Sequence, residues 1–89
     1  MPFEWDEAKQ RANLIKHGVD FAEVADFDWD QEWVRADTRN DFGELRLTAM
    51  APIGERVHVM VFTIRRTRLR LISLRRANTK ETLRYAAQV

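Results

Sequence analysis

Apolar and polar residues alternate along the second half of the chain, which is the pattern of half-buried β-strands. The alternation from Leu45 to Ala51 predicts one strand, and residues 56–64 predict the next. The second of these has apolar side chains on both faces, so we expect it to lie at the centre of a sheet. Shorter apolar runs predict an edge strand at Trp33–Asp37 and a fourth strand at Leu69–Leu74.

The first half of the chain has helical spacing instead. Asp6 is a candidate N-cap for a helix that ends at His17, and Gly18 follows as the expected residue after the last turn. Lys16 and His17 place cations in that last turn, where they favour the helix dipole. The apolar positions that we expect to face the core are Ala8, Ala12 and Ile15.

Two short helices are predicted by capping boxes, one from Asp20 to about Phe27 and one from Asn78 to about Gln88. Together the elements predict one α+β domain over residues 1–89. It has two N-terminal helices, a four-stranded, mainly antiparallel sheet and a C-terminal helix. No repeat or linker divides the chain. The expected turns are Thr38–Gly43 and Pro52–Glu55.

The composition excludes several classes of site. The chain has no cysteine, so it contains neither a disulfide nor a thiolate metal site. Its two histidines, His17 and His58, argue against a dedicated zinc site. The amino terminus is charged from the fourth residue, unlike a signal peptide, and the longest apolar run is too short for a membrane span. We expect a soluble, cytoplasmic protein without a cofactor or metal.

Charge is distributed unequally between the two halves. Residues 1–55 contain 6 Lys and Arg against 13 Asp and Glu, whereas residues 56–89 contain 9 against 1. Six arginines fall between Arg65 and Arg76 without an acid among them. Such separation is typical of a protein that binds a polyanion or an acidic partner. Mutual neutralisation of the two halves across the fold explains it equally well.

Three blocks of the sequence resemble a known family. The first is Trp5-Asp6-x-x-Lys9-x-x-x-Asn13-x-x-Lys16-His17-Gly18-Val19-x-Phe21, and the second is Asp37-x-Arg39-x-Asp41-Phe42-Gly43-Glu44-x-Arg46. The third is Thr63-x-Arg65 with Arg70-x-Ile72-Ser73-x-Arg75-x-Ala77 and then Glu81 to Tyr85. These blocks are similar to those of the BrnT-type toxins. The chain departs from that pattern at three places. Relatives usually have Tyr where Phe42 stands and a small residue where Leu74 stands, and they often have Gly-Asp in place of Arg66-Thr67.

The resemblance implies a small ribonuclease toxin with a RelE-like fold that arrests translation by cutting mRNA. It also implies a DNA-binding antitoxin, encoded beside the toxin, that neutralises it by direct binding. We expect this partner to be a ribbon-helix-helix protein. The resemblance also implies a hetero-oligomer built on an antitoxin dimer. This complex contacts operator DNA through the antitoxin and represses its own operon.

Metal-free RNA cleavage requires a proton acceptor for the 2′-OH, cations for the phosphorane and a proton for the leaving 5′-oxygen. His17 is the candidate for proton transfer, because imidazole titrates near neutral pH. Its neighbour Lys16 would hold the phosphate. Arginine matches phosphate oxygens in a fork, and Arg65 and Arg75 are the first candidates, with Arg46 third. Candidates for RNA binding are Arg70, Arg76 and Tyr85, the last through base stacking or a hydrogen bond.

Each candidate also has a structural interpretation. His17 before a glycine stabilises a helix end in many proteins. Glu44 is a candidate general base, or an ion-pair partner of Arg46. Trp29 and Trp33 are partner anchors or, more simply, core residues. At the level of function, the alternative to a ribonuclease is a non-catalytic subunit that binds RNA, DNA or the antitoxin.

Overall fold

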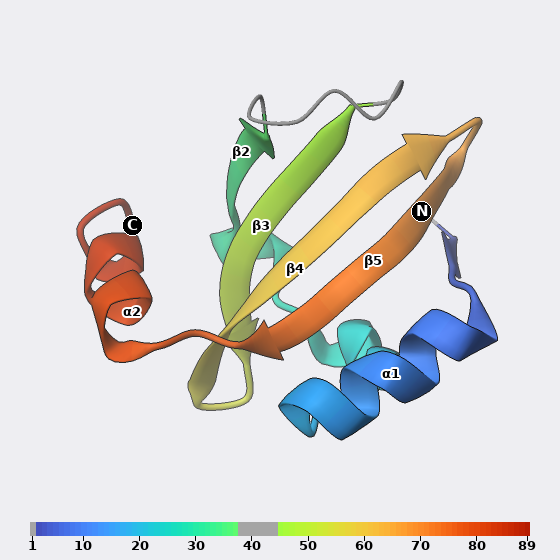
Figure 1. Ribbon diagram of the computed structural model, residues 1–89. Helices are drawn as coiled ribbons and strands as arrows, with labels where there is room; N and C mark the ends of the chain where they lie inside the picture. The colour runs from blue at the N-terminus through green and yellow to red at the C-terminus, as the bar shows by residue number, and fades with distance from the viewer. Residues whose placement is uncertain (1, 38–44) are drawn as a thin grey trace.

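The computed structural model describes residues 2–37 and 45–89. Within these residues five strands form one sheet in the order β1-β5-β4-β3-β2 (Figure 1). The strands are β1 (Phe3–Glu4), β2 (Trp33–Asp37), β3 (Arg46–Ile53), β4 (Arg56–Arg65) and β5 (Arg68–Arg76). The helices are α1 (Glu7–His17), the 3-10 helices η1 (Phe21–Asp26) and η2 (Trp29–Gln31), and α2 (Thr79–Ala86). The predicted turn at Thr38–Gly43 lies outside the described residues.

The α+β class is confirmed, but the predicted architecture is wrong in two respects. The sheet is five-stranded and mixed over the described residues, because β1 pairs in parallel with β5. A strand of two residues is too short for alternation to reveal it. In addition, the second N-terminal helix is the 3-10 helix η1, followed by η2. The capping box at Asp20 and Glu23 is present, as expected, yet it starts a 3-10 helix, the form common in short connecting pieces.

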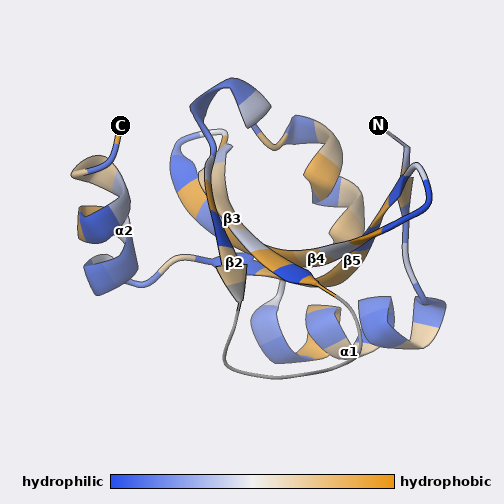
Figure 2. Cartoon of the chain, turned by 90° about the horizontal axis from the view of Figure 1, so that it is seen from above, coloured by the Kyte–Doolittle hydropathy of each residue, from blue (hydrophilic) through white to orange (hydrophobic). Residues whose placement is uncertain are grey.

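The sheet separates two environments. The main core lies on the face covered by η1 and η2, which we call the core face. In Figure 2 these helices lie on the opposite side of the sheet from α1. Buried side chains of this core are Val19, Phe21, Val24 and Phe27 from the first half, and Ala49, Ala51, Met60, Phe62, Leu69, Leu71 and Leu74 from the sheet.

The other side, the open face, carries side chains that alternate with those of the core. The hairpin of β4 and β5 suggested Val57, Val59, Val61, Leu69 and Leu71 as the centre of the core. Leu69 and Leu71 do lie there, whereas Met60 and Phe62 take the place of the three valines. A second, smaller cluster on the open face consists of Met50, Val59, Ala77 and Tyr85, with Trp33 and Val57 packed against it. This cluster holds α2 near one end of the sheet.

The bounds of α1 are confirmed, but its orientation differs from the prediction. Ile15, expected in the core, is 87% exposed. The helix instead turns Asn13 towards β5. The Asn13 side-chain amide donates to the carbonyl oxygens of Val19 at 2.9 Å and Leu74 at 2.7 Å, and its oxygen accepts from the backbone N–H of Leu74 at 3.1 Å. Asn13 thus satisfies backbone groups of β5 beyond the point where β1 ends, and it fixes α1 along that edge.

No helix in the described parts of the chain combines the length and apolarity needed to cross a membrane.

Candidate functional site

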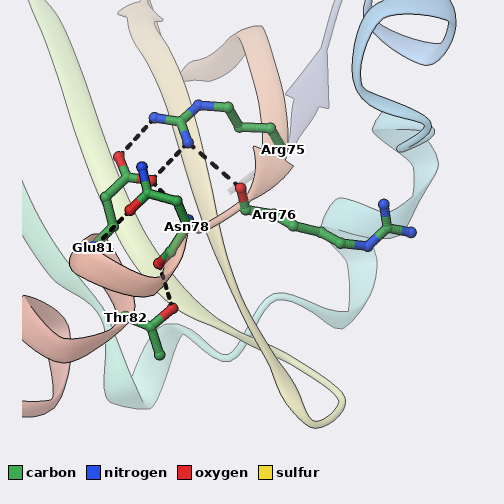
Figure 3. Close-up of polar contacts among 5 residues, drawn as sticks. All are labelled: Arg75, Arg76, Asn78, Glu81 and Thr82. Carbon is green, nitrogen blue, oxygen red and sulfur yellow. Dashed lines mark hydrogen bonds and ion pairs between the residues drawn. The ribbon is translucent and has the colours of Figure 1, made fainter.

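Arg75, one residue before the end of β5, forms a charged contact with two hydrogen bonds on the open face. Its Nη1 and Nη2 donate to the two carboxylate oxygens of Glu81, each at 2.8 Å (Figure 3). Hydrogen bonding from Arg75 is the main reason why the pKa of Glu81 falls to about 2. The same bond raises the pKa of Arg75. Glu81 is therefore ionised at neutral pH, and it orients the guanidinium rather than accepting protons.

The Glu81 carboxylate also caps the first turn of α2. It accepts a hydrogen bond from the backbone N–H of Asn78 at 3.0 Å, while Asn78 Oδ1 accepts from the Glu81 N–H at 2.8 Å. This is the capping box predicted from the sequence. The Glu81 carboxylate thus connects the start of α2 to Arg75. Glu81 was not among the predicted site residues, although its place in the third family block was a signal for it.

His17 lies close enough to Arg75 to respond to its charge. The pKa of the imidazole is lowered, first by burial and then by the positive charges of Lys16 and Arg75. The ring is half-buried at the end of α1, one turn beyond Asn13 on the side of the helix that faces β5. Three predicted residues, Lys16, His17 and Arg75, therefore lie within electrostatic range of one another. A neutral imidazole beside a guanidinium can accept a proton next to a bound phosphate.

Arg76 belongs to a different environment from Arg75. Neighbouring residues of a strand point to opposite faces, and Figure 3 shows the two side chains extending in opposite directions. The Arg76 guanidinium lies beside the end of α1: a Cβ placed on Gly18 would be 3.9 Å from its Nη1. The structure thus separates Arg76 from the contact between Arg75 and Glu81.

The other predicted arginines gather at the far end of the open face. Arg46 and Arg70 are both register partners of Thr63, on either side of β4, and Arg65 pairs with Arg68 near the hairpin tip. Arg70 also forms an ion pair with Glu4 at 2.8 Å. The register partner of Arg75 is Val59. Arg65 is therefore about 20 Å from that position along β4, at about 3.3 Å per residue. The structure does not bring Arg65 to His17.

Tyr85 has a packing role in the structure. Its side chain is 5% exposed within the second cluster. Its hydroxyl donates to the carbonyl oxygen of Gln31 at 2.5 Å. The ring is thus covered where we had expected it to be accessible to a base. The pattern of α2 alone could not distinguish the two, because an aromatic residue on a short terminal helix suits either role.

A pocket of about 440 Å³ adjoins Arg75 on the open face. Its walls come from four strands and from α2, and we call it the Trp33 pocket. Among the described residues, no group of three or more His, Asp or Glu side chains is placed to hold a metal ion. The residues that line the pocket are Trp33, Arg35, Ala36, Thr48, Met50, Val59, Val61, Arg75, Glu81 and Arg84.

Comparison with known proteins connects the chain to an activity. The family model described as the ribonuclease toxin BrnT of type II toxin–antitoxin systems matches residues 5–81. The matched range includes Asn13, Lys16, His17, Arg75 and Glu81. No curated protein sequence matches the chain. Because the family model spans most of the 89 residues, the chain belongs to the BrnT family of ribonuclease toxins of type II toxin–antitoxin systems.

Proposed function

We propose that this ribonuclease toxin cuts mRNA at the open face, around His17 and Arg75, without the help of a metal ion. The observation that carries the proposal is that His17, whose pKa is lowered, lies within electrostatic range of an arginine that Glu81 holds in place. The first favours an unprotonated base at neutral pH. The second is a cation that is already oriented for phosphate.

In the proposed reaction, His17 takes the proton of the RNA 2′-OH, and the 2′-oxygen attacks the adjacent phosphorus. The bond between phosphorus and the 5′-oxygen breaks, which leaves a 2′,3′-cyclic phosphate and a 5′-OH that takes a proton from solvent. Arg75 and Lys16 stabilise the negative charge that develops on the phosphorane oxygens. Two of the five guanidinium N–H groups of Arg75 remain for this task, because three donate to Glu81 and to the carbonyl of Arg76.

The arginines at the far end have a different task in this proposal. Arg46, Arg65 and Arg70 are about 15–20 Å from the site, measured by strand spacing, which is too far for the reacting phosphate. They instead hold the RNA backbone on one side of it, as in proteins that guide a single strand along a basic groove. Arg76, beside the end of α1, is a weaker candidate for the same role.

The type II family implies an antitoxin that binds this toxin, as well as an RNA target. We propose further that the antitoxin is a ribbon-helix-helix dimer. In that arrangement it inhibits the toxin in a hetero-oligomer and brings operator DNA to the complex. A toxin that acts on mRNA is expected to work in the cytoplasm.

Expression of the chain without its antitoxin tests the proposal. We expect growth arrest, and we expect the purified protein to degrade RNA in the presence of EDTA. His17→Ala and Arg75→Ala should each reduce cleavage by about 100-fold or more, with unchanged circular dichroism. Arg11→Ala, which removes an exposed cation from the same helix as His17, is the matched control. Normal growth and intact RNA would support the alternative, a non-catalytic binding subunit.

A further inference from the structure

The Trp33 pocket has the composition of a site for an unpaired nucleobase. The apolar side chains of Met50, Val59 and Val61 line it, together with the hydroxyl-bearing Thr48. An aromatic ring, Trp33, belongs to the same lining. A nucleobase has apolar faces and a polar edge, and proteins bind it by stacking it on aromatic or guanidinium groups and bonding its edge.

Trp33 and Arg35 together provide a stacking surface. The Arg35 Cζ lies 5.3 Å from the centroid of the Trp33 ring, within the range of a cation–π contact. The indole is fixed because it packs against the cluster that contains Tyr85. Arg35 is exposed on the same strand, so its guanidinium is accessible from solvent. A base can therefore stack on this pair with little ordering of the protein side chains.

The charge around the pocket selects a nucleotide over an uncharged ring. Three arginines line it, Arg35, Arg75 and Arg84. The acid in the lining, Glu81, is already bonded to Arg75 through both oxygens. The pocket is thus a cationic rim around an apolar floor, and Arg75 belongs both to this rim and to the proposed cleavage site.

We propose that the Trp33 pocket binds the base of the nucleotide whose phosphate contacts Arg75, with that base stacked on Trp33 and Arg35. This inference rests on the proposed function, because it assigns the subsite that positions RNA for cleavage at His17. Stacking is tolerant of base identity, so the subsite requires an unpaired base and directs the enzyme to single-stranded RNA.

The first test is binding, measured by NMR. The chain has three tryptophans, and Trp33→Phe identifies the indole N–H signal of Trp33. We expect adenosine 3′-monophosphate to shift that signal and to leave those of Trp5 and Trp29 in place. Ribose 5-phosphate, which has no base, should not shift it. Equal shifts with both compounds, or no shift with either, would overturn the proposal.

The second test is cleavage of RNA that lacks one base beside the cut bond. For the wild-type protein we expect the KM to rise about 10-fold, the usual scale of one stacked base. Arg35→Ala should raise the KM on intact RNA by a similar factor, and the missing base should then add little. Arg11→Ala is the charge-matched control. Equal KM values for both RNAs in the wild type refute the subsite but not the ribonuclease, whereas a chain that cuts neither RNA leaves the NMR experiment to decide the subsite.

Discussion

At the scale of single residues, the site depends on how Glu81 is shared between two tasks. The carboxylate completes the capping box of α2 and holds Arg75 through both of its oxygens. Sequence patterns predicted the capping box, because it is a local signal over four residues. They could not predict the contact with Arg75, because it depends on the turn after β5. Sequence patterns could not predict the proposed role of Arg35 either, because that role depends on its contact with Trp33 and on the position of α2.

Glu81→Gln tests this contact through stability, because glutamine can keep the capping box but not the ion pair. The pKa of Glu81 is lowered from an ordinary value of 4.5 to about 2, so its stabilising effect is complete above the ordinary value. It is then lost as the pH falls through about 2. We expect the variant to lose about 1 kcal/mol in free energy of unfolding at pH 7. Urea denaturation at pH 7, 4 and 3 should show the difference shrinking. A difference that stays constant with pH would contradict the assignment.

At the scale of elements, the sequence predicted the long strands and α1 well, and their relative placement poorly. Strands β3, β4 and β5 lie within three residues of their predicted bounds, because each has enough residues to display alternation. The orientation of α1 was wrong because the prediction followed apolar spacing. Its contact with β5 is made by a polar residue, Asn13. A hydrogen bond to a strand edge leaves no periodic pattern in the sequence.

Asn13→Ala tests whether this residue fixes α1 on β5. The side chain is 6% exposed and makes three hydrogen bonds to backbone groups. Its removal leaves the N–H and carbonyl of Leu74 without those partners, and we expect a loss of about 3 kcal/mol in free energy of unfolding. Arg11→Ala on the exposed side of α1 should change it by less than about 0.5 kcal/mol. If denaturation gives equal values for the two variants, Asn13 is not the anchor.

At the scale of the whole molecule, the charge difference between the halves becomes a difference between surfaces. Four of the arginines that we associate with RNA, Arg46, Arg65, Arg70 and Arg75, share the open face by strand register. The acidic residues of η1 and η2 lie on the other side of the sheet (Figure 2). Some neutralisation does occur, since Glu4 pairs with Arg70. The fold therefore shows both a separation of charge between the two surfaces and some neutralisation between the two halves of the chain.

This distribution predicts how RNA binding depends on salt. If about four phosphates are contacted, the logarithm of the association constant should fall with the logarithm of salt concentration with a slope of about −3. Arg65→Ala should reduce the magnitude of that slope by about 0.7, with little effect on kcat, because Arg65 is remote from His17. Fluorescence anisotropy with a labelled single-stranded RNA measures both. A large drop in kcat for Arg65→Ala would instead show that Arg65 takes part in the reaction.

The central claim is that His17 accepts a proton beside Arg75, and the pH dependence of kcat/KM for RNA cleavage tests it most directly. Burial and neighbouring cations lower the pKa of His17, so the acidic limb of the wild-type profile should lie below pH 6.5, the ordinary value. In Arg75→Ala the remaining activity should show this limb shifted upwards, since one of those cations is gone. His17→Ala should abolish it. A wild-type limb above 6.5, or one that persists in His17→Ala, would contradict the account.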